Sequence, residues 1–302
     1  MRALTPALIA LLSVSACTTI SPGVRENNAN RLAFPVFMIP RDVAAGPFTL
    51  KAFERVHNKG AVADLYIEGS GNVMVDDTNF EADPTPKRPV GMQLAAMDPN
   101  ANVIYLARPC QYRKQMAGAK ECPTKYLTTD MFAPDVIDAY DKAIDEIKAR
   151  YEIDAFNIVG FGSGGGLAAI LAGKRDDIKT LRTVAGLLDT QTYATAHQLT
   201  GYEGSFNPID SVPALMNKPQ HHYIAQFDAV IPNTIYHSYA QAFGDDRCLG
   251  YTFIQDVDHT YDWAENWAAF VKEPVTCNGP DPLEGERDAR KRTYAPMIGP
   301  KK

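Results

Sequence analysis

Along most of the chain, hydrophobic residues recur either at the two-residue period of strands or at the longer period of helices. Residues 49–56, 61–68 and 102–107 alternate between apolar and polar or run apolar, as strands do. A turn at residues 58–60, Asn-Lys-Gly, joins the first two segments. We therefore expect these two strands to form an antiparallel hairpin at the edge of a sheet.

From residue 134 onward, helix patterns and strand patterns follow one another. The expected helices cover residues 134–147, 167–172, 234–243 and 263–271, and the expected strands cover residues 155–160, 181–185, 222–226 and 251–255. Strands that alternate with helices predict a mainly parallel sheet with helices on both faces. The length suits a single α/β domain over residues 48–278.

One connection in this domain is too long for an ordinary loop. Residues 188–218 contain several aromatic side chains and would lie above the carboxyl ends of the strands, where ligands bind in open α/β sheets. We expect this segment to form a lid or a wall of a substrate site.

The N-terminal residues have the pattern of an export signal. Arg2, an apolar stretch over residues 7–14 and small residues before Cys17 predict a signal peptide covering residues 1–16. Val-Ser-Ala-Cys also resembles the bacterial lipobox, which implies that Cys17 becomes the lipidated first residue and that residues 17–47 form a tether. An ordinary signal peptide with a nearby cysteine is the alternative. Acyl chains such as palmitate would hold the protein at a membrane surface.

The residue after Cys17 indicates which membrane carries the anchor. Thr18 stands where an aspartate usually retains such proteins in the inner membrane. We therefore expect a protein of the bacterial cell envelope, anchored in the outer membrane and facing the periplasm.

Four further cysteines occur in this exported chain, Cys110, Cys122, Cys248 and Cys277. An even number in an oxidising compartment predicts two disulfides. Pairing of Cys110 with Cys122 and of Cys248 with Cys277 is favoured because each pair flanks one loop or one terminal element, and two other pairings remain open. The chain has no C-x-x-C or H-E-x-x-H spacing, so no metal site is expected.

Charge bears on the partners that the protein can have. The net charge is −6 and no basic cluster precedes the tail, which argues against nucleic-acid binding. Residues 279–302 are rich in proline, glycine and charge, and we expect a disordered tail there.

The most informative segment is residues 159–166, Val-Gly-Phe-Gly-Ser-Gly-Gly-Gly, between an expected strand and an expected helix. A sharp turn of this kind presents a nucleophilic serine when its sequence is G-x-S-x-G. Two residues before Ser163 lies Phe161, whereas Gly160, Gly162 and Gly164 fit the pattern with glycine in place of serine. Either Ser163 is the nucleophile of a turn shifted by one residue, or Gly162 stands where the nucleophile was lost.

Two residues downstream complete a catalytic order of nucleophile, acid and histidine, each placed after a strand. Asp228 follows one expected strand and His259 follows the next. Ser163 would attack an acyl carbon as His259 takes its proton, and Asp228 would orient the imidazole. Asp189, also just past a strand, is the alternative acid.

The oxyanion of such a reaction needs N–H donors. The candidates are the N–H group of Gly164, the residue after Ser163, and one from Gly69 or Ser70 in the loop after an early strand.

Several of these segments together resemble the bacterial secreted and lipoprotein α/β-hydrolases, over roughly residues 50–270. The resemblance rests on residues 66–71 (Tyr-Ile-Glu-Gly-Ser-Gly), residues 105–112 (Tyr-Leu-Ala-Arg-Pro-Cys-Gln-Tyr), the glycine turn, residues 184–189, residues 222–232 and His259. It implies the α/β-hydrolase fold, with an antiparallel N-terminal hairpin in a mainly parallel sheet. It also implies a serine hydrolase that cleaves an ester or related acyl bond of a small substrate through an acyl-enzyme, without a cofactor. The chain departs from the family in the register of the turn and in having Ser70 where the family usually has aspartate.

Two other interpretations compete with the serine hydrolase. A degenerate turn would leave the fold a binding or structural role in the envelope, although such a role has no chemical need for both Asp228 and His259. Residues 160–165 also match the dinucleotide motif G-x-G-x-x-G. That motif normally opens its domain, which is not the case here, and it leaves Asp228 and His259 unexplained.

Overall fold

The computed structural model describes residues 21–74, 79–113, 122–244, 247–259 and 261–277. These residues form an eight-stranded sheet in the order β1-β2-β4-β3-β5-β6-β7-β8. The strands are β1 Ile39–Ala45, β2 Phe48–Val56, β3 Ala63–Ile67, β4 Asn102–Leu106, β5 Phe156–Phe161, β6 Ile178–Val184, β7 Gln220–Ala225 and β8 Leu249–Ile254.

The sheet is mainly parallel, as predicted, with an antiparallel hairpin at its N-terminal edge. Strand β2 pairs antiparallel with β1 and with β4, and every other pairing between named strands is parallel. The predicted partner of residues 49–56 was wrong, because β3 does not pair with β2. All five residues of β3 are buried, as a central strand covered on both faces requires.

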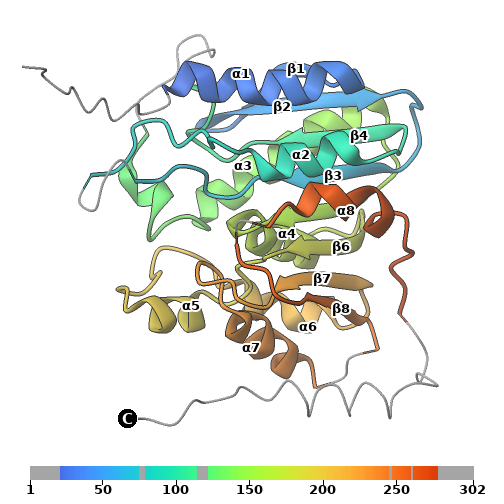
Figure 1. Cartoon of the computed structure of the whole chain (residues 1–302). Helices are drawn as coiled ribbons and strands as arrows, with labels where there is room; N and C mark the ends of the chain where they lie inside the picture. The colour runs from blue at the N-terminus through green and yellow to red at the C-terminus, as the bar shows by residue number, and fades with distance from the viewer. Residues whose placement is uncertain (1–20, 75–78, 114–121, 245–246, 260, 278–302) are drawn as a thin grey trace, which may run out of the picture.

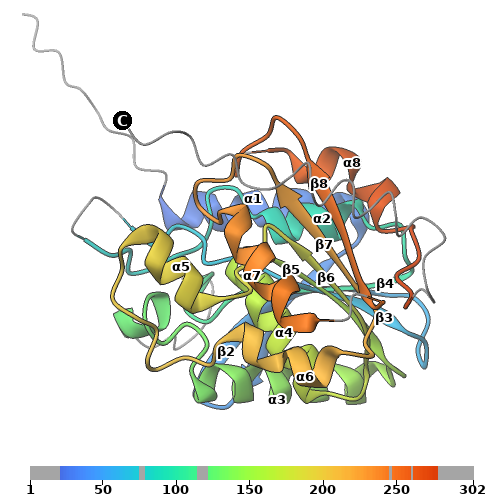
Figure 2. The same cartoon turned by 90° about the horizontal axis from the view of Figure 1, so that it is seen from below.

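Helices cover both faces of this sheet (Figures 1 and 2). One face bears α1 Pro22–Ala33, α2 Val90–Met97 and α8 Trp263–Phe270. The other face bears α3 Pro134–Tyr151, α4 Ser163–Lys174, α6 Val212–Leu215 and α7 Asn233–Phe243, with α5 Thr190–His197 next to α7. Three short 3-10 helices, η1 Phe34–Val36, η3 Thr124–Leu127 and η4 Pro208–Ser211, complete the described elements.

The two faces have separate hydrophobic cores because successive strand residues point to opposite sides. In β3, Leu65 and Ile67 pack into the core beneath α3 and α4, whereas Tyr66 packs into the core beneath α2 and α8. Strand β5 contributes residues to both cores and α4 to the first, so packing on both faces of the sheet supports the strand-to-helix turn at residues 160–164.

The ordered fold begins earlier than the predicted domain boundary at residue 48. Helix α1 buries Ala29 and Ala33, and β1 pairs with β2 over seven residues. The tether predicted for residues 17–47 is therefore wrong over these two elements. The signal peptide, Cys17 and the tail predicted for residues 279–302 lie outside the described residues.

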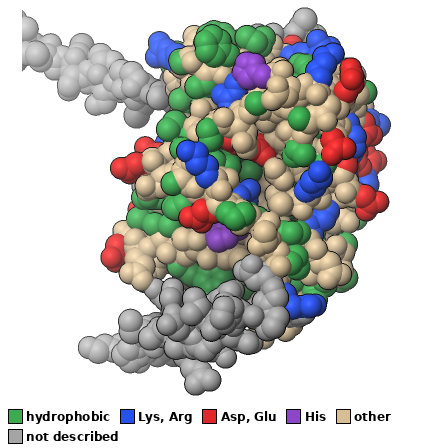
Figure 3. Space-filling model, turned by 90° about the vertical axis from the view of Figure 1, so that its right-hand side faces the viewer, with side chains coloured by type: hydrophobic (Ala, Val, Ile, Leu, Met, Phe, Trp, Pro, Cys, Tyr) green, Lys and Arg blue, Asp and Glu red, His purple; other side chains and the backbone are tan. Residues whose placement is uncertain are grey.

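Both expected disulfides are present, Cys110–Cys122 and Cys248–Cys277. Over the described residues, no helix is long and apolar enough to cross a membrane. Acidic and basic side chains are interspersed on the face shown in Figure 3, with no broad area of one sign.

Candidate active site

The candidate site is a pocket of about 920 Å³ that includes the turn after β5, the 69–71 loop after β3 and the loops after β7 and β8. Apolar side chains make up most of its wall: Met74, Phe80, Leu127, Met131, Phe161, Leu187, Leu199, Val230 and Ile231. Ser70, Ser163 and His259 also line it. A mostly apolar pocket with a few polar groups is typical of a small-molecule site.

The turn at residues 160–164 has Gly162 at its tip. Gly162 has φ 55° and ψ −123° and is the N-cap of α4. Its N–H donates to the Val184 carbonyl at 3.0 Å, and its own carbonyl accepts from the N–H groups of Leu187 and Gly165, each at 2.9 Å. These bonds hold the tip in a backbone conformation that side chains with a β-carbon rarely adopt.

The two flanking glycines explain the register of the turn. A β-carbon on Gly160 would overlap the Gly164 carbonyl, and one on Gly164 would overlap the carbonyl oxygens of Ile67 and Glu68. Glycine is therefore required two residues before and two residues after Gly162. The G-x-S-x-G pattern is centred on Gly162, the position that the sequence left open between two interpretations.

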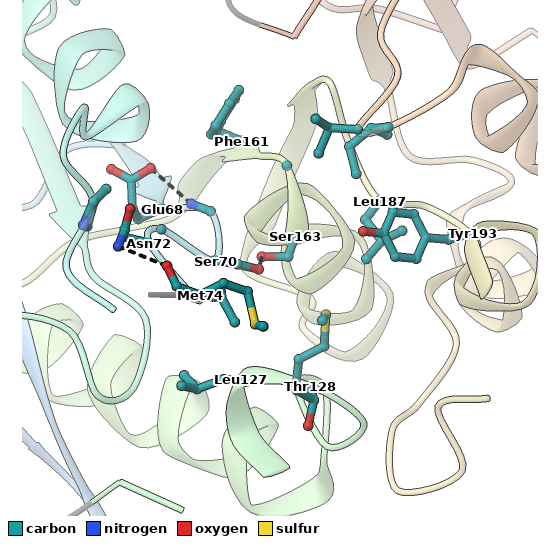
Figure 4. Close-up of a pocket in the computed structure, with 18 of the residues that line it drawn as sticks. Glu68, Ser70, Asn72, Met74, Leu127, Thr128, Phe161, Ser163, Leu187 and Tyr193 are labelled. Atoms are coloured by element: carbon teal, nitrogen blue, oxygen red, sulfur yellow. Dashed lines mark hydrogen bonds between the residues drawn. The ribbon is translucent and has the colours of Figure 1, made fainter. Parts of the chain in front are cut away.

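Ser163 is the first residue of α4 and is 5% exposed. Its hydroxyl shares a hydrogen bond of 2.7 Å with the Ser70 hydroxyl (Figure 4). Within the described part of the chain, Ser70 is the hydrogen-bond partner of this side chain, so the expected contact between Ser163 and His259 is not formed. The shift of the turn by one residue is the physical reason.

Asp228 and His259 lie together as predicted. Asp228, in the loop after β7, accepts hydrogen bonds from the N–H groups of Val230 at 2.8 Å and Ile231 at 2.7 Å. Its other carboxylate oxygen lies 2.7 Å from Nδ1 of His259. The Asp228 side chain is 1% exposed and that of His259 is 25% exposed. The imidazole is therefore accessible from the pocket, whereas the carboxylate bonded to it is buried.

Phe161 joins the histidine to the turn. Its ring centroid lies 5.5 Å from that of the His259 imidazole, at an interplanar angle of 33°. Phe161 is the last residue of β5 and directly precedes Gly162. The histidine therefore packs against the residue that begins the turn.

The 69–71 loop is held from below by two buried side chains that the sequence did not single out. Glu68 accepts the N–H of Gly69 at 3.0 Å, and Gln111 donates to the Gly69 carbonyl at 2.9 Å. The Gly69 N–H is thus already engaged, which contradicts its expected role as an oxyanion donor. Gln111 lies in the Arg-Pro-Cys-Gln-Tyr segment. The unusual sequence of this segment could have indicated that Gln111 supports the site.

Glu68 also fixes the start of α2. Its carboxylate accepts the N–H groups of Gly91 at 3.0 Å and Met92 at 3.3 Å, together with the Tyr105 hydroxyl at 3.1 Å. Burial raises the pKa of Glu68 above its usual value, although these hydrogen bonds oppose that effect. The carboxyl group is therefore a structural anchor beneath the loop.

Asp189 does not serve as the acid. It is the N-cap of α5 and accepts hydrogen bonds from the Ser238 hydroxyl and the Thr192 hydroxyl, each at 2.6 Å. Burial raises the pKa of Asp189, but the hydrogen bonds from Ser238 and Thr192 outweigh it and leave that pKa below its usual value. The helix cap, a common role for an aspartate after a strand, accounts for this residue.

The predicted lid contributes one wall of the pocket. It contains α5, η4 and α6, and Tyr193, Leu199 and Tyr202 line the pocket from this segment. Figure 4 shows Tyr193 and Leu187 across the pocket from Ser70. His197 lies against Tyr193, at 4.4 Å between ring centroids, and hydrogen-bonds through Nε2 to the Val230 carbonyl at 3.0 Å.

No group of three or more potential metal ligands occurs among the described residues. The polar groups nearest the turn are the His259 imidazole with its Asp228 partner and the hydroxyls of Ser70 and Ser163. Such groups can transfer protons and attack an acyl carbon.

The comparisons with known proteins are structural only, since no family model and no curated protein matches this chain. An esterase from Pyrococcus furiosus is similar, with a TM-score of 0.52 and 13% identity over 77% of this chain and 87% of its own. Est1E from Butyrivibrio proteoclasticus gives 0.53 and 12% over 77% and 97%. An acylaminoacyl peptidase from Pyrococcus horikoshii gives 0.56 and 11% over 85% of this chain but only 45% of its own. With the observed strand order, these similarities show that the chain has the α/β-hydrolase fold.

Proposed function

We propose that this protein hydrolyses an ester or related acyl bond through an acyl-enzyme, with Ser163 as nucleophile. The observation that supports this most strongly is the hydrogen bond between Asp228 and His259, at the edge of a pocket that also contains Ser163. A buried carboxylate on Nδ1 leaves Nε2 of the imidazole to act as a base.

Attack begins when the Ser163 hydroxyl leaves Ser70 and turns toward His259. The serine oxygen bonds to the acyl carbon while Nε2 of His259 takes the serine proton. The imidazolium then returns that proton to the leaving group as the bond to the acyl carbon breaks. Water, deprotonated by the same histidine, attacks the acyl-enzyme and releases the acid and the free serine.

Two N–H groups remain candidates for the oxyanion in this scheme. They are those of Ser70, in the 69–71 loop, and Gly164, in the first turn of α4. The N-terminus of a helix favours negative charge, which supports a role for Gly164.

The pocket favours a substrate with an apolar acyl group. Its apolar wall would remove such a group from water, at about 25 cal/mol per Å² of apolar surface buried. Similar folds include an esterase, a puromycin hydrolase and an Est1E structure with bound ferulic acid. These proteins support an ester or amide substrate of small size for this chain as well.

We propose further that the protein is anchored in the bacterial envelope through a lipid on Cys17. The N-terminal sequence pattern supports this location, and two disulfides suit an oxidising compartment. Labelled palmitate should be incorporated in cells that express the full chain and lost in Cys17→Ser; equal labelling of both would contradict the anchor.

A second candidate function is ligand binding without catalysis. It is favoured by one observation, the glycine at the tip of the turn with the Ser163 hydroxyl bound to Ser70. Such a protein would use the pocket and the pair of Asp228 and His259 only to hold a ligand.

A fluorophosphonate probe distinguishes these functions. Under the proposed function, the wild type is labelled on the peptide that contains Ser163, and labelling is lost in Ser163→Ala and falls strongly in His259→Ala. Tyr251→Phe, which alters a side chain on β8 outside the pocket, is the matched control and should be labelled like the wild type. A folded wild type without label would contradict the acyl-enzyme and favour binding.

A further inference from the structure

Gly162 differs from its neighbours in the turn because there is room for a side chain on it. Apart from its two chain neighbours, a β-carbon built on Gly162 meets no atom closer than the Cα of Gly69, at 4.0 Å. By contrast, a β-carbon on Gly160, Gly164 or Gly166 would overlap backbone carbonyl oxygens. The other four glycines of the turn and first helix turn, Gly160, Gly164, Gly165 and Gly166, are thus confined by packing, whereas Gly162 faces open space.

The open position belongs to the pocket. Gly162 lines it, next to the 69–71 loop. It directly follows Phe161, whose ring packs against His259, whereas the Ser163 hydroxyl is bound to Ser70. A hydroxyl at position 162 would therefore enter the site without breaking an existing side-chain contact.

The backbone at Gly162 is already fixed by its surroundings. Three hydrogen bonds, with Val184, Leu187 and Gly165, set the tip of the turn. A residue with a β-carbon is strained at φ 55°, but serine nucleophiles are held in strained turns of this kind. The geometry therefore tolerates a side chain there at some loss of stability.

We infer that position 162 is the attack position of this turn and that Gly162 limits the hydrolytic rate of the wild type. The inference deepens the proposed function, in which Ser163 must attack from one residue further along. A displacement of about 1 Å at a reacting group can lower a rate by about 100-fold. Replacing Gly162 with serine should recover a gain of this order.

The introduced hydroxyl would react in two steps, acylation of residue 162 and hydrolysis of the resulting ester. Its oxygen bonds to the acyl carbon as His259 takes its proton, and His259 then protonates the leaving group. The residue after the attack position is Ser163, so its N–H in the first turn of α4 becomes the oxyanion donor. Water then hydrolyses the ester on residue 162 and restores the hydroxyl.

Four proteins test the inference: wild type, Gly162→Ser, Gly162→Ala and Gly162→Ser combined with Ser163→Ala. Each is assayed with a fluorophosphonate probe and with p-nitrophenyl butyrate. Gly162→Ala is the matched control because it adds the same backbone strain without a hydroxyl. We expect Gly162→Ser to react about 100-fold faster than the wild type. The label should map to residue 162 and persist in the double variant.

Different results would contradict the attack position at residue 162 and the proposed role of Ser163. A folded Gly162→Ser protein that is labelled no faster than Gly162→Ala would overturn the inference. So would failure of both single variants to fold, because the inference requires room at position 162. An unlabelled wild type beside a labelled Gly162→Ser protein would contradict only the proposed function of Ser163.

Discussion

At the scale of single residues, the site combines a buried carboxylate that holds a histidine with a serine that lies one residue past the tip of the turn. Asp228 is buried and holds His259 by a hydrogen bond of 2.7 Å, whereas Ser163 is bound to Ser70. The proximity of Asp228 and His259 was predictable because each follows a strand in the chain. The state of Ser163 was not, since a run of glycines fits the turn in two registers, which are separated by the backbone angles of Gly162 and the packing of Gly160 and Gly164.

The contact between Ser70 and Ser163 gives a prediction at this scale. Ser70→Ala should raise the fluorophosphonate labelling rate of Ser163 about fivefold, because a neutral hydrogen bond stabilises the resting position by about 1 kcal/mol. The measurement is the second-order labelling rate. Ser70→Thr keeps a hydroxyl and serves as the control; an unchanged or lower rate in Ser70→Ala would show that Ser70 does not restrain Ser163.

At the scale of elements, the strands and helices that hold the site come from local sequence patterns. Strands β5, β7 and β8 and helices α3 and α7 were predictable from the period of their apolar residues. Strand β3 was misassigned because its short turn after β2 suggested a hairpin. Strand β4, some 35 residues later in the chain, lies between them in the sheet. A pairing between distant segments leaves no local signal of this kind.

The 69–71 loop gives a prediction for the element that faces the turn. Gln111→Ala removes the donor to the Gly69 carbonyl, and we expect the labelling rate and kcat to fall about tenfold while KM changes little. The physical reason is that the loop loses its fixed position opposite α4.

The control for this variant is Gln220→Ala, which alters a buried glutamine on β7 that donates to the Leu215 carbonyl at 3.2 Å. Both variants should lower the melting temperature. Only Gln111→Ala should slow labelling; equal rates in the two variants would assign Gln111 a purely structural role.

At the scale of the whole molecule, the sheet positions the candidate site, and two disulfides link segments of the chain. The pocket lies at the carboxyl ends of the strands, and the cysteine pairs that were predictable from their spacing close one loop and one terminal segment. Helix α1 was missed because its sequence is polar and rich in asparagine, so its burial depends on neighbours far along the chain. The lipid anchor on Cys17 remains a prediction from the sequence.

A buried carboxyl group on the face beneath α8 makes the stability of the whole fold depend on pH. Asp98 accepts the Tyr66 hydroxyl at 2.6 Å, and burial, with the nearby Asp64 carboxylate, raises the pKa of Asp98 to about 7. The folded state therefore binds this proton more tightly than the unfolded state. The free energy of unfolding should fall as pH rises from the ordinary aspartate range to about 7.

Urea unfolding at pH 5 and pH 7 checks this dependence. The wild type should lose about 2 kcal/mol more than Asp98→Asn between these values, since each pKa unit corresponds to about 1.4 kcal/mol. Parallel pH profiles for the two proteins would contradict the assigned pKa.

The central claim is that Ser163, with His259 as its base, attacks an acyl carbon, and acid-quenched mass spectrometry during turnover of p-nitrophenyl butyrate tests it most directly. The account predicts one added butyryl group in the wild type, on the peptide containing Ser163, and none in His259→Ala. An unmodified wild type, with acylation only after Gly162→Ser, would contradict Ser163 as the nucleophile.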